Sequence, residues 1–239
     1  MASEVTLTTL RASVLDRADM TGGTFIVAAQ LDEYINEEAA KLYYLLANLF
    51  EDLFYATEDI TLVAGTESYD LPQTAGSTVK LHKSLKVYYL EGGKRRTLRR
   101  FVMDDLDKEE YLYGPALATG IHMRYRIMGN KIFFTPTPAA GTVEMWYIPE
   151  FVKLVNAGDK LSGSFQVVAG WEQYLIYGAA AQCLLKEESL EQAQGYQAKQ
   201  AKLEADYRIE ASERDVAEPQ RITDVYGYGS GVTYGFGGW

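Results

Sequence analysis

The sequence contains few of the residues from which most catalytic and metal sites are built. Its 239 residues include one cysteine, Cys183, and two histidines, His82 and His122. A single cysteine excludes an internal disulfide, and because Cys183 lies in a helical pattern we expect it to be a small buried hydrophobic side chain rather than a reactive thiol. Neither histidine has a second ligand at metal spacing, so we expect no metal and no other cofactor.

Motifs of enzymes and of membrane proteins are also missing. There is no Gly-x-Ser-x-Gly nucleophile turn and no Gly-x-x-x-x-Gly-Lys phosphate loop. The acidic run Asp104–Glu110 lacks the alternating oxygen ligands and central glycine of a calcium loop, and the first turn of a short helix explains it better. No basic region precedes an apolar run, and no apolar stretch could span a bilayer. We therefore expect neither a secretion signal nor a membrane partner.

The acidic and basic residues are unevenly distributed along the chain. The net charge of −10 divides into −6 for residues 1–56, +1 for 57–149, −5 for 150–218 and 0 for 219–239. General binding to nucleic acid requires a basic face that displaces counterions from phosphates, and two acidic flanks do not supply one.

Two segments near the start have the spacing of amphipathic helices. Thr6 can cap the first, in which Leu7, Leu10 and Val14 share one side. The second covers about residues 28–54. Its apolar positions recur every three or four residues, namely Leu31, Ile35, Ala39, Leu42, Leu46, Leu49 and Leu53. Its charged positions fall on the other faces, namely Asp32, Glu33, Glu37, Glu38 and Lys41.

Between residues 58 and 149 the apolar period changes to two, and five of the six prolines occur here. A hairpin is predicted from His122–Met128 and Lys131–Thr135, which Gly129-Asn130 joins by a two-residue turn. Further strands are expected at 60–63, 79–90, 95–101 and 142–148, and one short helix at 104–112.

Helical spacing returns after residue 150. One face is shared by Val168, Trp171, Leu175, Ala179 and Cys183. A capping box from Ser189 to Gln192 then predicts a new helix after a brief break. This helix is polar over about 190–217 and has only a narrow apolar stripe, so it either projects into solvent or lines neighbouring subunits.

These patterns predict an α+β fold. We expect a helical bundle made of two sequence-separated helical hairpins, with an inserted antiparallel β-rich domain and an extended C-terminal arm. The expected domains are residues 1–57 with 150–218 for the bundle, 58–149 for the insertion and 219–239 for the arm.

The arm has an unusual composition. Its last fourteen residues contain six glycines and five aromatic side chains but no charge. Glycine at this density favours an extended chain, whereas large aromatic rings are typical anchors of interfaces. We therefore interpret it as a docking arm whose anchors are Tyr226, Tyr228, Tyr234, Phe236 and Trp239.

One basic run stands out in the middle segment. It follows the Gly92-Gly93 turn and comprises Lys94, Arg95, Arg96, Arg99 and Arg100. Three interpretations remain open: contact with an acidic face of the same or a neighbouring protein, simple solvation, and contact with DNA phosphates. Nearby, Trp146-Tyr-Ile-Pro149 could form an aromatic platform for sugars, although such residues are also typical of strand ends and of a small β core.

Seven stretches in order resemble the head-to-tail adaptor (connector) proteins of tailed bacteriophages. They are Leu10–Met20 with Phe25 behind it, Leu31–Glu37, Val63–Pro72, Gly129–Pro136, Trp146–Pro149, Gly170–Tyr174 and Lys186–Ser189. None of them is a catalytic motif, and together they span nearly the whole chain. The residues after Tyr226 have no counterpart in the family pattern.

The resemblance implies a structural virion protein at the head–tail junction, made in the host cytoplasm, and not an enzyme. Such proteins form a ring, commonly of about twelve copies, beneath the portal. The implied partners are other copies of the chain, the portal protein, a downstream tail or stopper protein, and genomic DNA that passes through the lumen without specific binding. Two alternatives stay open: a stopper or tail-tube component, and a tail-associated glycan hydrolase, which would need two converging carboxylates.

Overall fold

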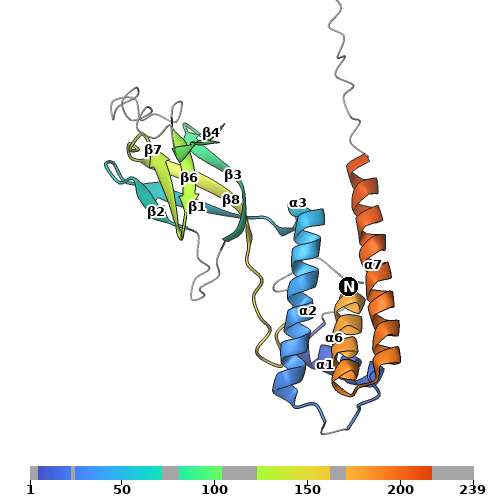
Figure 1. The fold of residues 1–239 in the computed structure, drawn as a ribbon. Coiled ribbons are helices and arrows are strands. Elements are labelled where there is room, and N and C mark those ends of the chain that lie inside the picture. Colours follow the sequence, from blue (N-terminus) through green and yellow to red (C-terminus); the bar gives the residue numbers. More distant parts are fainter. Residues whose placement is uncertain (1–4, 23–24, 72–80, 104–122, 162–170, 217–239) are drawn as a thin grey trace, which may run out of the picture.

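The computed structural model describes residues 5–22, 25–71, 81–103, 123–161 and 171–216 (Figure 1). Within these ranges the chain has five helices and eight strands, and most strand pairs are antiparallel, so the expected α+β class is confirmed. The helix expected at 104–112, His122, Val168 and the arm all lie outside the described residues.

The first helix, α1 (Leu7–Arg17), forms as its sequence predicts. The Thr6 side chain accepts a hydrogen bond from the Thr9 backbone N–H at 3.3 Å, which satisfies one of the free donors of the first turn. Leu7, Leu10 and Val14 are fully buried on one side.

The long helix expected at 28–54 is interrupted. Helix α2 covers Ala28–Leu49, and the single turn α3 covers Glu51–Phe54. Phe50 between them leaves the helical region, with φ −132° and ψ 59°. The break places the buried Phe50 ring in a stack on Trp171, at 5.3 Å between ring centroids. A contact with a residue more than a hundred positions away therefore accompanies the end of α2.

The two C-terminal helices are α6 (Glu172–Lys186) and α7 (Leu190–Val216). The predicted break between them is confirmed, and Glu188 in it adopts a left-handed conformation with φ +66°. Cys183 on α6 is fully buried, as expected. The predicted narrow stripe of α7 is also confirmed, because the buried side chains over residues 190–213 are Ala193, Tyr207 and Ala211.

The strands form two four-stranded sheets. One has the order β1 (Ala56–Leu62), β8 (Gly141–Pro149), β3 (Leu81–Glu91), β4 (Lys94–Thr97). The other has the order β2 (Ser68–Asp70), β7 (Lys131–Thr135), β6 (Arg124–Met128), β5 (Arg99–Arg100). The β6–β7 hairpin turns at Gly129-Asn130 as predicted, and Gly129 has φ +60°.

Two strand predictions need correction. Strand β2 was not anticipated, because its three residues are too few to show a period of two. The single strand expected at 95–101 is divided at Leu98, so that β4 belongs to one sheet and β5 to the other. Leu98 is buried between them. The chain therefore crosses from one sheet to the other inside what the sequence presents as one basic run.

The buried apolar side chains form two clusters. The larger joins α1, α2, α6 and α7 and includes Leu10, Ile35, Leu46 and Leu175. The smaller lies between the two sheets, where Val87, Val143 and Met145 of the first sheet meet Tyr125, Ile132 and Phe134 of the second. The strands thus form a two-layer sandwich beside one end of α2 (Figure 1).

Contacts at the end of α2 link the sandwich to the helices. The Tyr43 hydroxyl donates to the Pro149 carbonyl oxygen at 2.8 Å. The His82 ring on β3 lies 4.5 Å from the Tyr44 ring, between centroids, and the neighbouring Lys83 pairs with Glu51. His82 therefore has a packing role in this junction.

Candidate functional site

The predicted basic run is divided between two places in the sandwich. On β4, the Arg95 guanidinium binds both carboxylate oxygens of Glu144 on β8, at 2.5 and 2.9 Å. Arg96 pairs more loosely with Glu91, at 3.4 Å. These two arginines thus contact acidic residues of the same chain. A role of the run between subunits or on DNA remains a prediction.

The Arg95–Glu144 ion pair changes the pKa of the glutamate. Hydrogen bonds from Arg95 hold the pKa of the Glu144 carboxyl below its ordinary value, against the opposing effect of burial. The guanidinium carbon of Arg95 also lies 5.7 Å from the centroid of the Trp146 ring. Tyr55 stacks on that ring at 5.0 Å and 10°, and Tyr88 meets it edge-on. The aromatic group considered for sugar binding is therefore packed against neighbours in its own chain.

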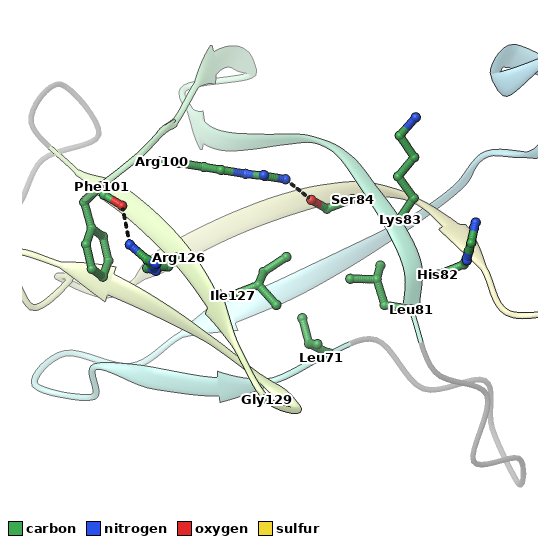
Figure 2. Close-up of a pocket in the computed structure, with 10 residues that line it drawn as sticks. All are labelled: Leu71, Leu81, His82, Lys83, Ser84, Arg100, Phe101, Arg126, Ile127 and Gly129. Atoms are coloured by element: carbon green, nitrogen blue, oxygen red, sulfur yellow. Dashed lines mark hydrogen bonds between the residues drawn. The ribbon is translucent and has the colours of Figure 1, made fainter. Parts of the chain in front are cut away.

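Arg100 faces a different environment. Together with Arg126 on β6 and Lys83 on β3 it lines a cavity of about 720 Å³ between the two sheets (Figure 2). Arg100 donates to Ser84 Oγ at 2.6 Å and to the Tyr125 hydroxyl at 3.3 Å. Two predicted basic residues, Arg95 and Arg100, thus lie on separate surfaces, and Arg126 joins Arg100 although it is distant in sequence.

A second hollow of about 540 Å³ runs along the first half of α2. Asp32, Glu33 and Glu37 line it, opposite the segment from Phe151 to Val155. Asp32 is paired with Arg11 on α1 through two hydrogen bonds of 2.5 and 2.6 Å. The acidic residues of α2 are thus partly used for internal packing and partly exposed.

One prediction for α2 was wrong. Glu38 was assigned to a face other than the apolar one, yet only 3% of it is accessible. Its Oε1 accepts from Lys41 Nζ at 2.6 Å and from Gln182 Nε2 at 2.7 Å, and its Oε2 accepts from Gln200 Nε2 at 2.7 Å. Gly178 on α6 allows this approach, because a Cβ there would lie 2.3 Å from Oε2. That glycine inside a helical pattern was the available signal for a close contact.

The described residues bear on metal binding and on thiol chemistry. Among them, no group of three or more His, Cys, Asp or Glu side chains is arranged to hold a metal ion. Burial raises the pKa of the Cys183 thiol to about 11, so it is protonated and inaccessible at neutral pH.

No helix in the described ranges has the length and apolar character needed to cross a membrane. The five aromatic residues predicted to anchor the arm lie outside the described part of the chain.

The described residues thus form an α+β scaffold with ion pairs, hollows and a long polar helix. The chain belongs to the SU10 adaptor protein family, whose sequence model matches residues 5–223. The match includes every described helix and strand and agrees with the resemblance to phage head-to-tail adaptors. It indicates a structural component of a bacteriophage. No curated protein matches the chain.

Proposed function

We propose that this protein is the head-to-tail adaptor of a tailed phage, which forms a ring beneath the portal, joins the capsid to the tail and lets the genome pass. The family match over residues 5–223 carries the proposal, because it covers the complete set of described elements in order. A ring of identical copies requires heterologous contacts, in which one face of a copy meets a different face of the next.

In this proposal the four helices α1, α2, α6 and α7 are the bundle that builds the ring body, and residues 58–149 are an inserted domain. The separate apolar clusters of helices and strands support this division. Long exposed faces on α7 leave room for neighbouring subunits. The proposed boundaries are residues 1–57 with 150–218, 58–149, and 219–239.

The charge distribution supports passage of DNA without adhesion. The two helical flanks carry −6 and −5. Carboxylates that face a lumen would repel the phosphate backbone, which is the converse of binding by counterion release. Exposed acidic residues of α7, such as Glu210 and Glu213, are candidates for the lining. Electron microscopy of the ring that placed all these carboxylates on its outer surface would contradict this part of the proposal.

The arm is proposed to bind the portal through its five aromatic residues. Ordering fourteen residues costs on the order of 10 kcal/mol or more, so several anchors must bind together. Removal of only part of the arm should therefore abolish attachment rather than weaken it gradually.

The deciding experiment compares the mass of the full chain alone with its mass after addition of purified portal. We expect a ring of defined stoichiometry on the portal, and no ring on the portal with a variant that ends at Asp224. Replacement of Tyr226, Tyr228, Tyr234, Phe236 and Trp239 by leucine is the matched control, because it keeps the length and removes the rings. Normal attachment of the truncated variant would refute the role of the arm, and a bare portal in the presence of the full chain would refute the adaptor function.

A further inference from the structure

The cavity between the two sheets contains two arginines, Arg100 and Arg126, whose partners among the described residues are neutral. Arg100 donates to the Tyr125 hydroxyl oxygen. It also donates to Ser84 Oγ, and Arg126 donates to the Phe101 carbonyl oxygen at 3.4 Å (Figure 2). Within the described ranges no carboxylate pairs with either guanidinium, whereas Arg95 in the same sandwich binds Glu144 on both oxygens. A guanidinium has five N–H donors, and the described residues engage two of those of Arg100 and one of those of Arg126.

The chemistry of the cavity walls defines the class of ligand. Next to the two arginines lie the apolar side chains of Leu71, Leu81 and Ile127, and the described lining contains no aspartate or glutamate. The volume of about 720 Å³ is within the range of ligand-sized pockets. Two guanidiniums beside an apolar wall suit a carboxylate carried by an apolar segment, since arginine binds carboxylates in a bidentate manner. A DNA phosphate has the charge but not the apolar part.

The turn between α6 and α7 has the complementary composition. It exposes Leu185 (42%) and Leu190 (57%). Glu187, Glu188 and Glu191 are also exposed, and the described part of the chain provides no partner for their carboxylates. Acidic groups flanked by two leucines match arginines flanked by leucine and isoleucine. We infer that the α6–α7 turn of one copy inserts into the inter-sheet cavity of a neighbouring copy, where its carboxylates bind Arg100 and Arg126.

The fold excludes this contact within one chain. Lys186 at the end of α6 bonds to Gln30 and to the Phe25 carbonyl oxygen, so the turn lies at the beginning of α2. The sandwich follows the other end of α2, about 30 Å away for a helix of 22 residues (Figure 1). The contact is therefore heterologous. Two copies joined in this way are displaced from each other along the axis of α2. They can close into a ring only if the α2 axes are inclined to the axis of the ring.

The inference rests on the proposed ring, and a charge exchange on the full-length chain tests it. One variant carries Arg100→Glu and Arg126→Glu, a second carries Glu187→Arg and Glu188→Arg, and a third carries all four changes. Ring formation on the portal is measured by sedimentation. Each two-residue variant should raise the concentration needed for ring formation at least about tenfold, because like charges meet across the contact. The third should recover most of that loss.

Lys131→Glu and Asp59→Arg are the matched controls. Both residues are exposed and lie outside the cavity and the turn, so their reversal should leave ring formation within about twofold of the unmodified chain. Circular dichroism melting shows whether each variant folds, and the milder Arg126→Gln replaces the reversed cavity variant if that variant does not.

The outcomes separate the two hypotheses. The turn-in-cavity contact is overturned if both two-residue variants form rings as well as the unmodified chain does, or if the four-residue variant recovers nothing. Either result leaves the adaptor function intact. Loss of binding to a short DNA duplex in the cavity variant, without any effect of the turn variant, overturns it in favour of a phosphate site. Absence of any ring with the unmodified chain refutes the adaptor function and this contact together.

Discussion

The buried carboxylate among the helices and the two arginines of the inter-sheet cavity differ in the partners they have. Among the helices, the buried Glu38 receives hydrogen bonds from Lys41, Gln182 and Gln200 of the same chain. Between the sheets, Arg100 and Arg126 have only neutral acceptors within the described residues. The first arrangement is complete in one copy, because a buried charge without partners would be costly. The second has donors that the described residues do not engage, which is why we assign it to a partner.

The largest expected effect tests whether the two apolar clusters are separate units. Leu46 and Met145 are both fully buried, one among the helices and one between the sheets. Replacement of either by alanine should lower the free energy of unfolding by about 2–5 kcal/mol, through lost burial and a cavity. Thermal melting measures this loss in both variants.

Cys183 distinguishes the two variants by position. Its thiol is buried among the helices, where burial raises its pKa to about 11. Leu46→Ala should therefore speed its alkylation by a thiol reagent, and Met145→Ala should not. Equal acceleration by both changes would mean that helices and strands unfold as one unit.

The next effect concerns Glu38. Glu38→Ala should cost about 2–3 kcal/mol, since it leaves the amide donors of Gln182 and Gln200 without their acceptor near the helix core. Glu37→Ala, at the exposed neighbouring position, should change the stability by less than about 0.5 kcal/mol. Urea unfolding of the two variants measures the difference. Equal stability of the Glu38→Ala and Glu37→Ala variants would show that water replaces the Glu38 carboxylate at no cost.

Two helical glycines provide a third test of the same junction. Gly178→Ala should cost about 1–3 kcal/mol, because its Cβ would lie 2.3 Å from Glu38 Oε2 and 2.4 Å from Gln200 Nε2. Gly195→Ala on α7 meets nothing within 4 Å and should stabilise the protein by about 0.5–1 kcal/mol. Melting temperatures that move in the same direction for both changes would contradict the close approach at Gly178.

The smallest effect lies in the sandwich and depends on pH. Arg95 lowers the pKa of Glu144 in the folded protein. A depressed carboxyl pKa contributes stability that is present above the unfolded pKa and is lost as the pH falls through the folded value. Arg95→Leu should return the Glu144 pKa toward its ordinary value and reduce this acid sensitivity. A carboxyl NMR titration measures the shift, and an unchanged titration would show that the pair does not form in solution.

The sequence predicted the elements that depend on near neighbours. Thr6 marked the start of α1, a spacing of three or four identified α2, and Gly129-Asn130 defined the hairpin. Each of these signals acts within a few residues of the backbone that it shapes. The sequence also indicated the family, through motifs whose order extends over most of the chain.

Features that depend on distant residues were missed. The break at Phe50 coincides with its stack on Trp171, and Glu38 is buried because two glutamines and Gly178 reach it from α6 and α7. The crossing at Leu98 separated Arg95 from Arg100, although both belong to one basic run.

The sequence by itself determined the helical periods, the hairpin turn, the uneven charge and the family, because these are properties of composition and short-range order. Only the tertiary structure decided which charged groups have partners. Glu38 gains three donors, and Arg100 on β5 comes beside Arg126 on the neighbouring strand β6, through contacts between distant parts of the chain. Those contacts exist only once the helices and the strands have packed.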